Sequence, residues 1–393
     1  MSCSEQITQD TDKQTQNTEP TQGSDTITEP FIKRSDVFFT QPNWNELKKG
    51  NQGKYSDYSV DATMWGFLPP TLPDFDYQTD FESSMTGYVN GITNHEREGV
   101  DWVSRIEWDV IWVGMTSRYP DTYQEAMVKR LDGENLEIDW FPGHYFFSSH
   151  SPLFLDYIKW QIRDVAFYGN DAGPGTLDAL LFYSQQSSPA HYHWGGDFSK
   201  ACMANFNTWL SENYSPAELN SLLELSDGQD ITNFHYGTYL KNKGYTSATY
   251  EAETVNVPNN IPLNNEFRHF LQDWNNSYLA GLVKFTDEIA KIRGYPYKEG
   301  VGYIEVGTSS PLLDPYWNGI RMPFNDEFDF YVQEFNHRAT DLTISSDVML
   351  MYKLADSIDK PLALTAQPFP DWNYMVDNPH AVDLARSWIA LAY

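Results

Sequence analysis

Cysteine, basic residues and long apolar runs are scarce in this sequence, and each shortage excludes a class of protein. The 393 residues include only two cysteines, Cys3 and Cys202, so a disulfide scaffold is excluded, and no cysteine/histidine spacing typical of zinc sites occurs. The 26 Lys and Arg stand against 55 Asp and Glu. The resulting formal charge of −29 argues against nucleic acid or an anionic membrane as a partner. No run of 18 apolar residues exists, so we expect no membrane span.

The N-terminal segment, residues 1–29, lacks aromatic residues and has few aliphatic ones. It cannot bury enough apolar surface to offset the entropy lost on ordering, so we predict a disordered tether. Cys3 followed by a polar linker is typical of a bacterial lipoprotein after signal-peptide removal. An exported bacterial protein, anchored by lipid through Cys3 in the periplasm or at the cell surface, is therefore expected. An incidental cysteine in an ordinary N-terminus is the alternative.

After residue 30, short apolar runs alternate with helical segments. The runs are residues 62–70, 101–112, 143–152, 178–189, 301–311, 328–337 and 362–372. Several are apolar on both faces, as parallel strands covered by helices should be. Alternating strands and helices at this spacing predict βα units in a parallel sheet.

Seven such strands favour an α/β fold of the (β/α)₈ TIM-barrel class, formed by residues 30–393. No glycine-rich phosphate-binding motif follows the first strand, which weakens the nucleotide-binding alternative. An eighth strand is missing, since residues 378–393 read as an amphipathic helix. We therefore expect a fragment, or a barrel whose last strand lies elsewhere. A rival count takes residues 37–41 as the first strand, although a poor crossover helix follows them.

Start and stop signals mark the helices between these strands. Capping boxes are predicted at Thr79–Glu82, Thr122–Glu125 and Ser215–Glu218, and Pro152 after Ser151 opens another helix. Gly294 is a C-terminal stop. A long, mostly helical insertion, about residues 190–300, is expected after the fourth strand. It contains helical patterns at 198–214, 216–225 and 265–294 and a polar stretch at 242–260.

Three stretches resemble sugar-hydrolysing barrels of the β-galactosidase and agarase type. "RIEWD" at 105–109 is similar to the second-strand tip of these enzymes. "GGDFSKACMANFNTWLSENYS" at 195–215 resembles the helix after their fourth strand, and "NPHAVDLARSWIALAY" at 378–393 the helix after their seventh. The resemblance covers about a third of the barrel.

The resemblance implies a retaining glycosidase with an acid/base Glu ending strand four and a nucleophilic Glu ending strand seven. The sequence departs at both positions. The predicted fourth strand ends in Gln185 and Gln186, and the seventh in Gln367. An amide neither gives up a proton at useful pH nor acts as a carboxylate nucleophile, so the implied mechanism does not carry over to these residues.

Two other carboxylates are the candidates for catalysis. Glycoside hydrolysis needs two carboxyl groups about 5–10 Å apart. Barrel strands supply such groups at their carboxyl ends. Glu305 and Glu334 are predicted there on neighbouring strands, with one pKa raised by apolar surroundings into the range of a general acid. Structural pairing with an arginine such as Arg105, Arg321 or Arg338 is the alternative for each.

The remaining polar and aromatic residues near the strand ends suit sugar binding, because amides bond hydroxyls and aromatic rings stack on sugar faces. These candidate substrate-binding residues are Glu107, Trp108, Asp109, His150, Gln185, Gln186, His193, Trp194, Asn336, His337, Gln367 and Trp372. For each Trp, core packing is the alternative, and a structural histidine is the alternative for His150. No metal or cofactor is expected, since His191 and His193 follow the fourth strand rather than the first. Cys202 is predicted to lie in a helix, with its side chain in the protein core.

Together these features predict a glycoside hydrolase that cleaves a poly- or oligosaccharide with two carboxylates. The amide tips would bind sugar hydroxyls while neighbouring strands supply the acids. The alternative from another class is an inactive barrel that binds glycans. A polysaccharide lyase is a third reading.

Overall fold

A computed structural model describes the ordered elements of the chain. The described residues are 62–67, 85–86, 88–93, 101–107, 115–116, 118–137, 142–143, 145–168, 177–183, 196–223, 231, 234–256, 258–309, 327–335, 353, 356–357, 359–366, 379–380 and 383. All structural statements below concern these residues. The predicted tether, Cys3, the capping box at 79–82 and the helix at 378–393 lie outside them almost entirely.

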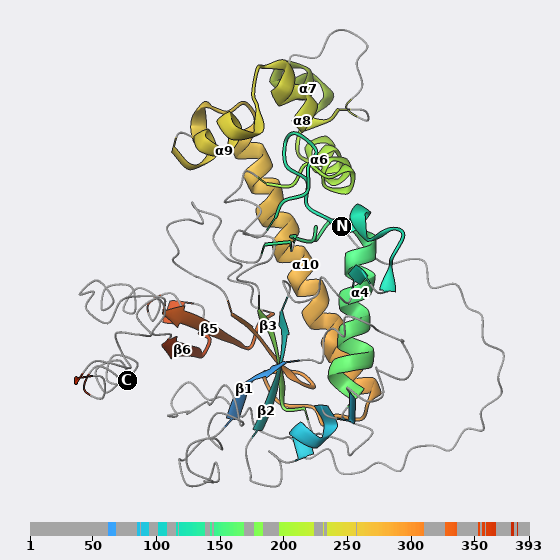
Figure 1. Cartoon of the computed structure of the whole chain (residues 1–393), viewed down its shortest axis with the longest axis vertical. Coiled ribbons are helices and arrows are strands. Elements are labelled where there is room, and N and C mark those ends of the chain that lie inside the picture. Colours follow the sequence, from blue (N-terminus) through green and yellow to red (C-terminus); the bar gives the residue numbers. More distant parts are fainter. Residues whose placement is uncertain are drawn as a thin grey trace, which may run out of the picture.

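Six parallel strands form one sheet whose order follows the sequence (Figure 1). They are β1 (Ala62–Phe67), β2 (Asp101–Glu107), β3 (Ala179–Tyr183), β4 (Glu305–Ser309), β5 (Phe330–Phe335) and β6 (Leu362–Ala366). All five pairings are parallel. In an open doubly wound sheet the strand order reverses at a switch point, and these six strands show no such reversal.

Both faces of the sheet are buried. Trp102, Leu180 and Tyr331 belong to a core that the sheet shares with helices, whereas alternate positions of the same strands lie on what we term the far face. Its members Val103, Leu181, Phe330 and Val332 are at most 1% exposed and belong to neither helix-packed cluster. Among the described side chains, those of β2, β3 and β5 are therefore apolar on both sides of the sheet, as predicted.

The run 143–152 is not a strand of the sheet, which corrects one of the seven predicted strands. Tyr145 and Phe147 instead form isolated antiparallel bridges with Glu137 and Met127. β2 pairs directly with β3, so the run 178–189 supplies the third described strand rather than the fourth. The large insertion therefore follows the third described strand.

Helix α4 (Pro152–Trp160) follows this segment and continues as the π-helical turn η3 (Gln161–Val165). Pro152 occupies its first turn, as predicted, because the missing N–H costs nothing there. The predicted capping box at Thr122–Glu125 forms only the short 3-10 helix η2 (Tyr123–Ala126), without a side-chain cap.

Five helices and one 3-10 turn fill the long segment between β3 and β4. They are α6 (Lys200–Asn213), α7 (Pro216–Leu223), α8 (Tyr236–Asn242), α9 (Ser247–Asn256), η6 (Pro258–Asn260) and α10 (Asn264–Ile292). The predicted capping box before α7 is confirmed. Ser215 N donates to Glu218 Oε2 at 2.7 Å, and Glu218 N donates back to Ser215 Oγ at 3.4 Å. The polar stretch 242–260 contains α9, which the sequence did not predict.

Helix α10 joins two separate cores. Its first turns, with Phe267 and Phe270, pack with α6–α9, and we call this unit the helical subdomain. Its later turns, with Leu279 and Leu282, pack with the sheet and α4. At about 1.5 Å per residue the 29-residue helix is about 43 Å long, far longer than any strand it covers. Gly294, at φ +85°, follows its end as the predicted stop.

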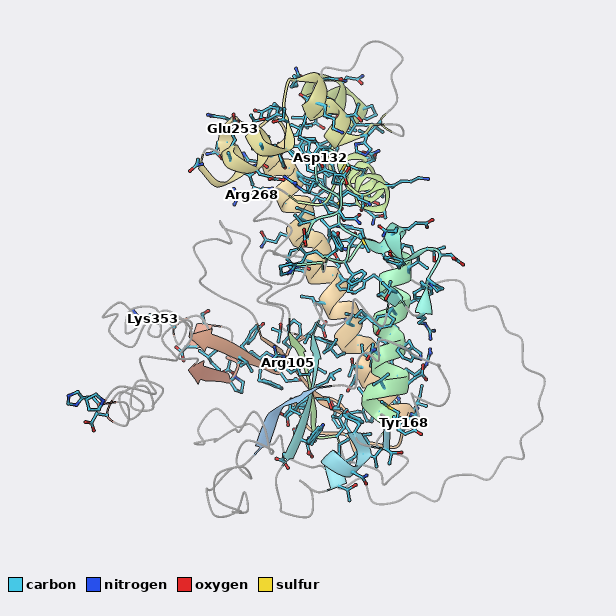
Figure 2. All side chains as sticks on the ribbon, in the orientation of Figure 1. Arg105, Asp132, Tyr168, Glu253, Arg268 and Lys353 are labelled. Atoms are coloured by element: carbon cyan, nitrogen blue, oxygen red, sulfur yellow. The ribbon has the colours of Figure 1, made fainter. Side chains whose placement is uncertain are left out.

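The helical subdomain lies at the top of Figure 1, beyond the carboxyl end of β3, whereas the arrowheads of β5 and β6 point to the left of the view. α10 runs back to the amino end of the sheet, where Leu177 N, just before β3, donates to Tyr295 Oη at 3.3 Å. The start of α10 therefore extends past the opposite, carboxyl end. Figure 2 places Arg105 within the sheet and Asp132, Glu253 and Arg268 in the region of the helical subdomain.

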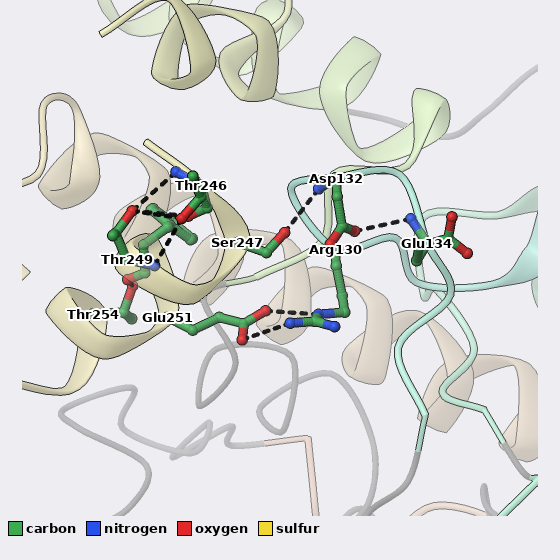
Figure 3. Close-up of polar contacts among 9 residues, drawn as sticks. Arg130, Asp132, Glu134, Thr246, Ser247, Thr249, Glu251 and Thr254 are labelled. Carbon is green, nitrogen blue, oxygen red and sulfur yellow. Dashed lines mark hydrogen bonds and ion pairs between the residues drawn. The ribbon is translucent and has the colours of Figure 1, made fainter. Parts of the chain in front are cut away.

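A hairpin turn before α4 docks onto the helical subdomain (Figure 3). Arg130 forms a bidentate ion pair with Glu251 of α9, with N···O distances of 2.8 and 2.9 Å. Asp132 N donates to Ser247 Oγ at 2.9 Å at the start of the same helix. Leu131 between them is buried in the subdomain core. The turn thus fixes α9 relative to the segment that precedes α4.

Asp197 provides a second connection between these parts, which sequence reasoning did not predict. Its buried carboxylate accepts bonds from Lys129 N at 3.1 Å and from Ser199 N at 2.7 Å, and from the hydroxyl groups of Ser148 and Ser199. Burial raises the pKa of Asp197, and these donors oppose the shift. The Ser199 hydroxyl also caps α6 by accepting from Cys202 N. Cys202 itself is buried, as predicted.

Among the described helices, none combines the length and the apolar character needed to cross a lipid bilayer.

Candidate active-site edge of the sheet

The register of the sheet aligns one row of residues at its carboxyl edge. Glu107, the last residue of β2, pairs with Tyr183, the last of β3, and Tyr183 pairs with Ser309, the last of β4. Ser309 in turn lies opposite Val332 of β5. Because catalytic groups of parallel α/β folds come from the carboxyl ends of strands, this row marks the edge where a site is expected.

Glu334 lies at this edge. It is the fifth of six residues in β5 and pairs with Thr365 of β6, two residues beyond the row that contains Val332. The predicted position at a strand's carboxyl end is therefore confirmed for Glu334. Glu107 also ends its strand, as predicted.

Glu305 lies at the opposite end, and here the prediction of a carboxyl-end position is wrong. β4 begins at Glu305, and the side chain is 1% exposed. Its carboxylate is 3.5 Å from Lys298 Nζ, a lysine of the turn that precedes the strand. Glu305 is therefore a buried ion-pair partner at the amino end, although its partner is a lysine rather than one of the arginines considered above.

The separation between Glu305 and Glu334 excludes them as a pair acting on one bond. Ser309 lies opposite Val332, so Glu305 is four residues below this level and Glu334 two above it. Six residues at about 3.3 Å each place the two positions about 20 Å apart along the strands. Glycosidases need about 5–10 Å between their carboxyl groups.

Asp329, just before β5, shares the amino end with Glu305. Val306 N donates to Asp329 Oδ2 at 2.8 Å, which ties the start of β4 to the start of β5. Burial raises the pKa of Asp329 to about 7; the negative charges of Glu305 and Asp287 add to the shift, and Lys360 opposes it. Sequence reasoning missed this group, because an aspartate flanked by two phenylalanines gives no signal of its own.

His150 is a core residue in the structure rather than part of an open site. Its ring stacks on Trp274 and Phe270 of α10, with centroid separations of 4.4 and 5.2 Å, and it is 6% exposed. Its Nδ1 is 3.3 Å from Asn205 Nδ2 of α6. These contacts support a structural role for His150, which was the alternative to sugar binding.

The other predicted binding residues lie outside the described part of the chain. They are Trp108, Asp109, Gln185, Gln186, His193, Trp194, Asn336, His337, Gln367 and Trp372. Three of them directly follow described strands: Trp108 follows β2, Asn336 follows β5 and Gln367 follows β6. Gln185 lies two residues after the end of β3. Within the described residues, no three His, Cys, Asp or Glu side chains form a group that could hold a metal ion.

Two known proteins are similar to almost the whole chain. It is 28% identical over 377 residues to an alpha-agarase of Alteromonas agarilytica and 28% identical over 381 residues to an alpha-agarase of Thalassotalea agarivorans. Both alignments cover 92% of this chain but only 24% and 23% of the relatives. The chain therefore spans about a quarter of the length of the curated relatives it matches. No protein-family model matches the chain.

Proposed function

We propose that this chain is a glycoside hydrolase domain that cleaves agarose or a closely related galactan. The observation that carries the proposal is its similarity to two alpha-agarases over 92% of its length. The strand order and the buried far face support it, since consecutive parallel strands buried on both sides are typical of a (β/α)₈ barrel. The polymer is too large to enter a cell, so the proposal includes export, and the predicted lipid anchor at Cys3 stays a prediction.

Glu334 and Glu107 are the two carboxylates that we propose for catalysis, with Glu107 replacing Glu305. Both lie at the carboxyl edge, on β5 and β2. Three interstrand steps of about 4.8 Å separate these strands, and Glu334 lies two residues, about 7 Å, beyond the row of Glu107. The two positions are therefore about 16 Å apart along a flat sheet and closer across a closed barrel. The proposal requires both side chains to reach inward from this edge and so approach the separation that glycosidases use.

In this mechanism one carboxylic acid protonates the glycosidic oxygen while the C–O bond to the anomeric carbon breaks. The other carboxylate either attacks that carbon or activates the water that does. One water molecule is consumed for each bond, its oxygen becoming part of the new reducing end. The amides that follow β3 and β6, Gln185, Gln186 and Gln367, are proposed to bond sugar hydroxyls.

A glycan-binding protein without catalysis is the second candidate. The position of Glu305 favours it, because the structure removes one of the two carboxylates predicted for the chemistry from the carboxyl edge. Such a protein would bind agarose and release no product.

Substitution of the proposed carboxylates separates the two candidates. In Glu334→Gln and Glu107→Gln we expect turnover on agarose to fall about 10²–10⁴-fold with unchanged folding, since each removes one proton-transfer or nucleophilic group. Reducing-end release, normalised to folded protein by circular dichroism, is the measurement.

Glu305→Gln is the matched control. It removes the same charge from the opposite end of the sheet, beside Lys298. We expect lower thermal stability and unchanged turnover per folded molecule. Full turnover in both edge variants, or a loss in Glu305→Gln equal to theirs, contradicts the assignment.

A further inference from the structure

Two partly exposed rings lie at the end of α6 in the helical subdomain. Trp209 is held in place on three sides, because its ring stacks on Phe206 at a centroid separation of 6.2 Å and contacts Phe270 of α10 at 6.3 Å. Its indole N–H donates to Asp273 Oδ2 at 3.0 Å. The ring is therefore fixed in orientation while one part of it stays in contact with solvent.

Tyr214 lies beside this ring, at the C-cap of α6. The two ring centroids are 6.2 Å apart at an interplanar angle of 63°, so one ring forms a floor and the other a wall. Tyr214 N donates to Leu210 O at 3.0 Å, which fixes the backbone that carries the ring. Partial burial raises the pKa of Tyr214, and the carboxylates of Glu266 and Glu218 add to the shift. The two carboxylates are therefore near enough to act on the phenol electrostatically.

Rings bordered by carboxylates match the chemistry of a neutral sugar. A galactose ring has an apolar face of C–H groups, which packs against an aromatic ring, and hydroxyls at its edge, which donate to carboxylates. The formal charge of −29 disfavours an anionic polymer as the occupant. At a centroid separation of 6.2 Å the two rings are in edge-to-face contact, so they form one continuous aromatic surface.

We propose that Trp209 and Tyr214 form a second galactan-binding site, separate from the carboxyl edge of the sheet. A polymer chain held at this platform is bound to the same molecule as the catalytic carboxylates, because α10 belongs to the cores of both the helical subdomain and the sheet. The site binds polymer and takes no part in bond cleavage. The identity of the sugar rests on the proposed function, whereas the existence of the platform does not.

Binding and cleavage measured separately test this site. Retention of the whole chain on agarose beads is compared between the parent and the Tyr214→Ala and Trp209→Phe variants, all carrying Glu334→Gln so that the polymer is not consumed. Trp209→Phe keeps an aromatic ring against the subdomain core. We expect the apparent dissociation constant to rise about five- to tenfold in each. Without Glu334→Gln, turnover on short agaro-oligosaccharides is expected to stay unchanged.

Tyr239→Ala is the matched control, since Tyr239 of α8 is another partly exposed ring of the same subdomain, packed on Phe234 just before that helix. It is expected to leave retention unchanged.

Retention equal to the parent in both platform variants, with native circular dichroism, overturns the site. If the wild-type chain is retained without releasing product and the platform variants are not, the site stands and the hydrolase proposal fails. If the wild-type chain releases product and the platform variants are fully retained, the hydrolase proposal stands and the second binding site fails.

Discussion

At the scale of single residues, the position of Glu305 shows what a sequence run does and does not determine. The run 301–311 looks like one continuous strand with an acid near its middle. Gly300 and Gly302, at φ +78° and +111°, instead fold the chain into a turn closed by a bridge between Lys298 and Gly302. The strand therefore begins at Glu305, and the acid lies at the amino end. Glu334, in a run without glycine, lies one residue before the end of its strand.

The buried carboxyl of Asp329 predicts a pH dependence of stability. Its pKa is raised to about 7 in the folded protein, from an ordinary value of 3.8. Between about pH 4 and pH 7 the unfolded chain therefore loses this proton while the folded chain keeps it, and the free energy of unfolding falls as pH rises. In Asp329→Asn, which keeps an acceptor for Val306 N, we expect greater stability than wild type at about pH 8 and no gain at about pH 4.

Urea unfolding at several pH values measures this difference. Glu299→Gln, at an exposed carboxylate of the preceding turn, is the control and is expected to follow the wild-type profile. A gain in Asp329→Asn that is equal at every pH is incompatible with titration of the buried group.

At the scale of elements, local pairing explains the main error. The run 143–152 has the composition of a buried strand, but Gly143, at φ +85°, follows Pro142 in a turn. The residues after it therefore find their partners in the nearby segment 127–137 rather than in the sheet. The capping box before α7 formed because Ser215 and Glu218 need only each other and the helix between them. The long helix and the capping box before α7 could be predicted from neighbours in sequence, whereas the pairing of the run 143–152 depends on which segment folds against it.

Two glycines predict opposite effects of the same substitution on stability. A Cβ at Gly307 of β4 would overlap the ring of Phe330, its register partner on β5. We expect Gly307→Ala to destabilise the protein by about 1–3 kcal/mol through overpacking. A Cβ at Gly281, within α10, meets nothing within 4 Å, so Gly281→Ala should stabilise by about 0.5–1 kcal/mol. Thermal unfolding measures both, and a loss at Gly281 or no loss at Gly307 refutes the packing described.

At the scale of the whole molecule, helix α10 is the element that relates the two cores. The sequence predicted a long helix at 265–294, and the structure confirms it within two residues at either end. The amphipathic pattern did not reveal that its first turns serve one core and its later turns another. Trp274 lies at the boundary between these two parts of the helix, because it packs against both cores. The first turns of α10 therefore carry the helical subdomain, with Trp209 and Tyr214, beyond the carboxyl end of β3.

Cleavage of agarose in water enriched in oxygen-18 tests the central claim most directly. The account predicts soluble oligosaccharides that each carry one heavy oxygen at the new reducing end, with no gain in ultraviolet absorbance. Unsaturated ends without the label would show a lyase. Binding without any product would show a glycan receptor. Either result contradicts hydrolysis by carboxylates at the carboxyl edge of the sheet.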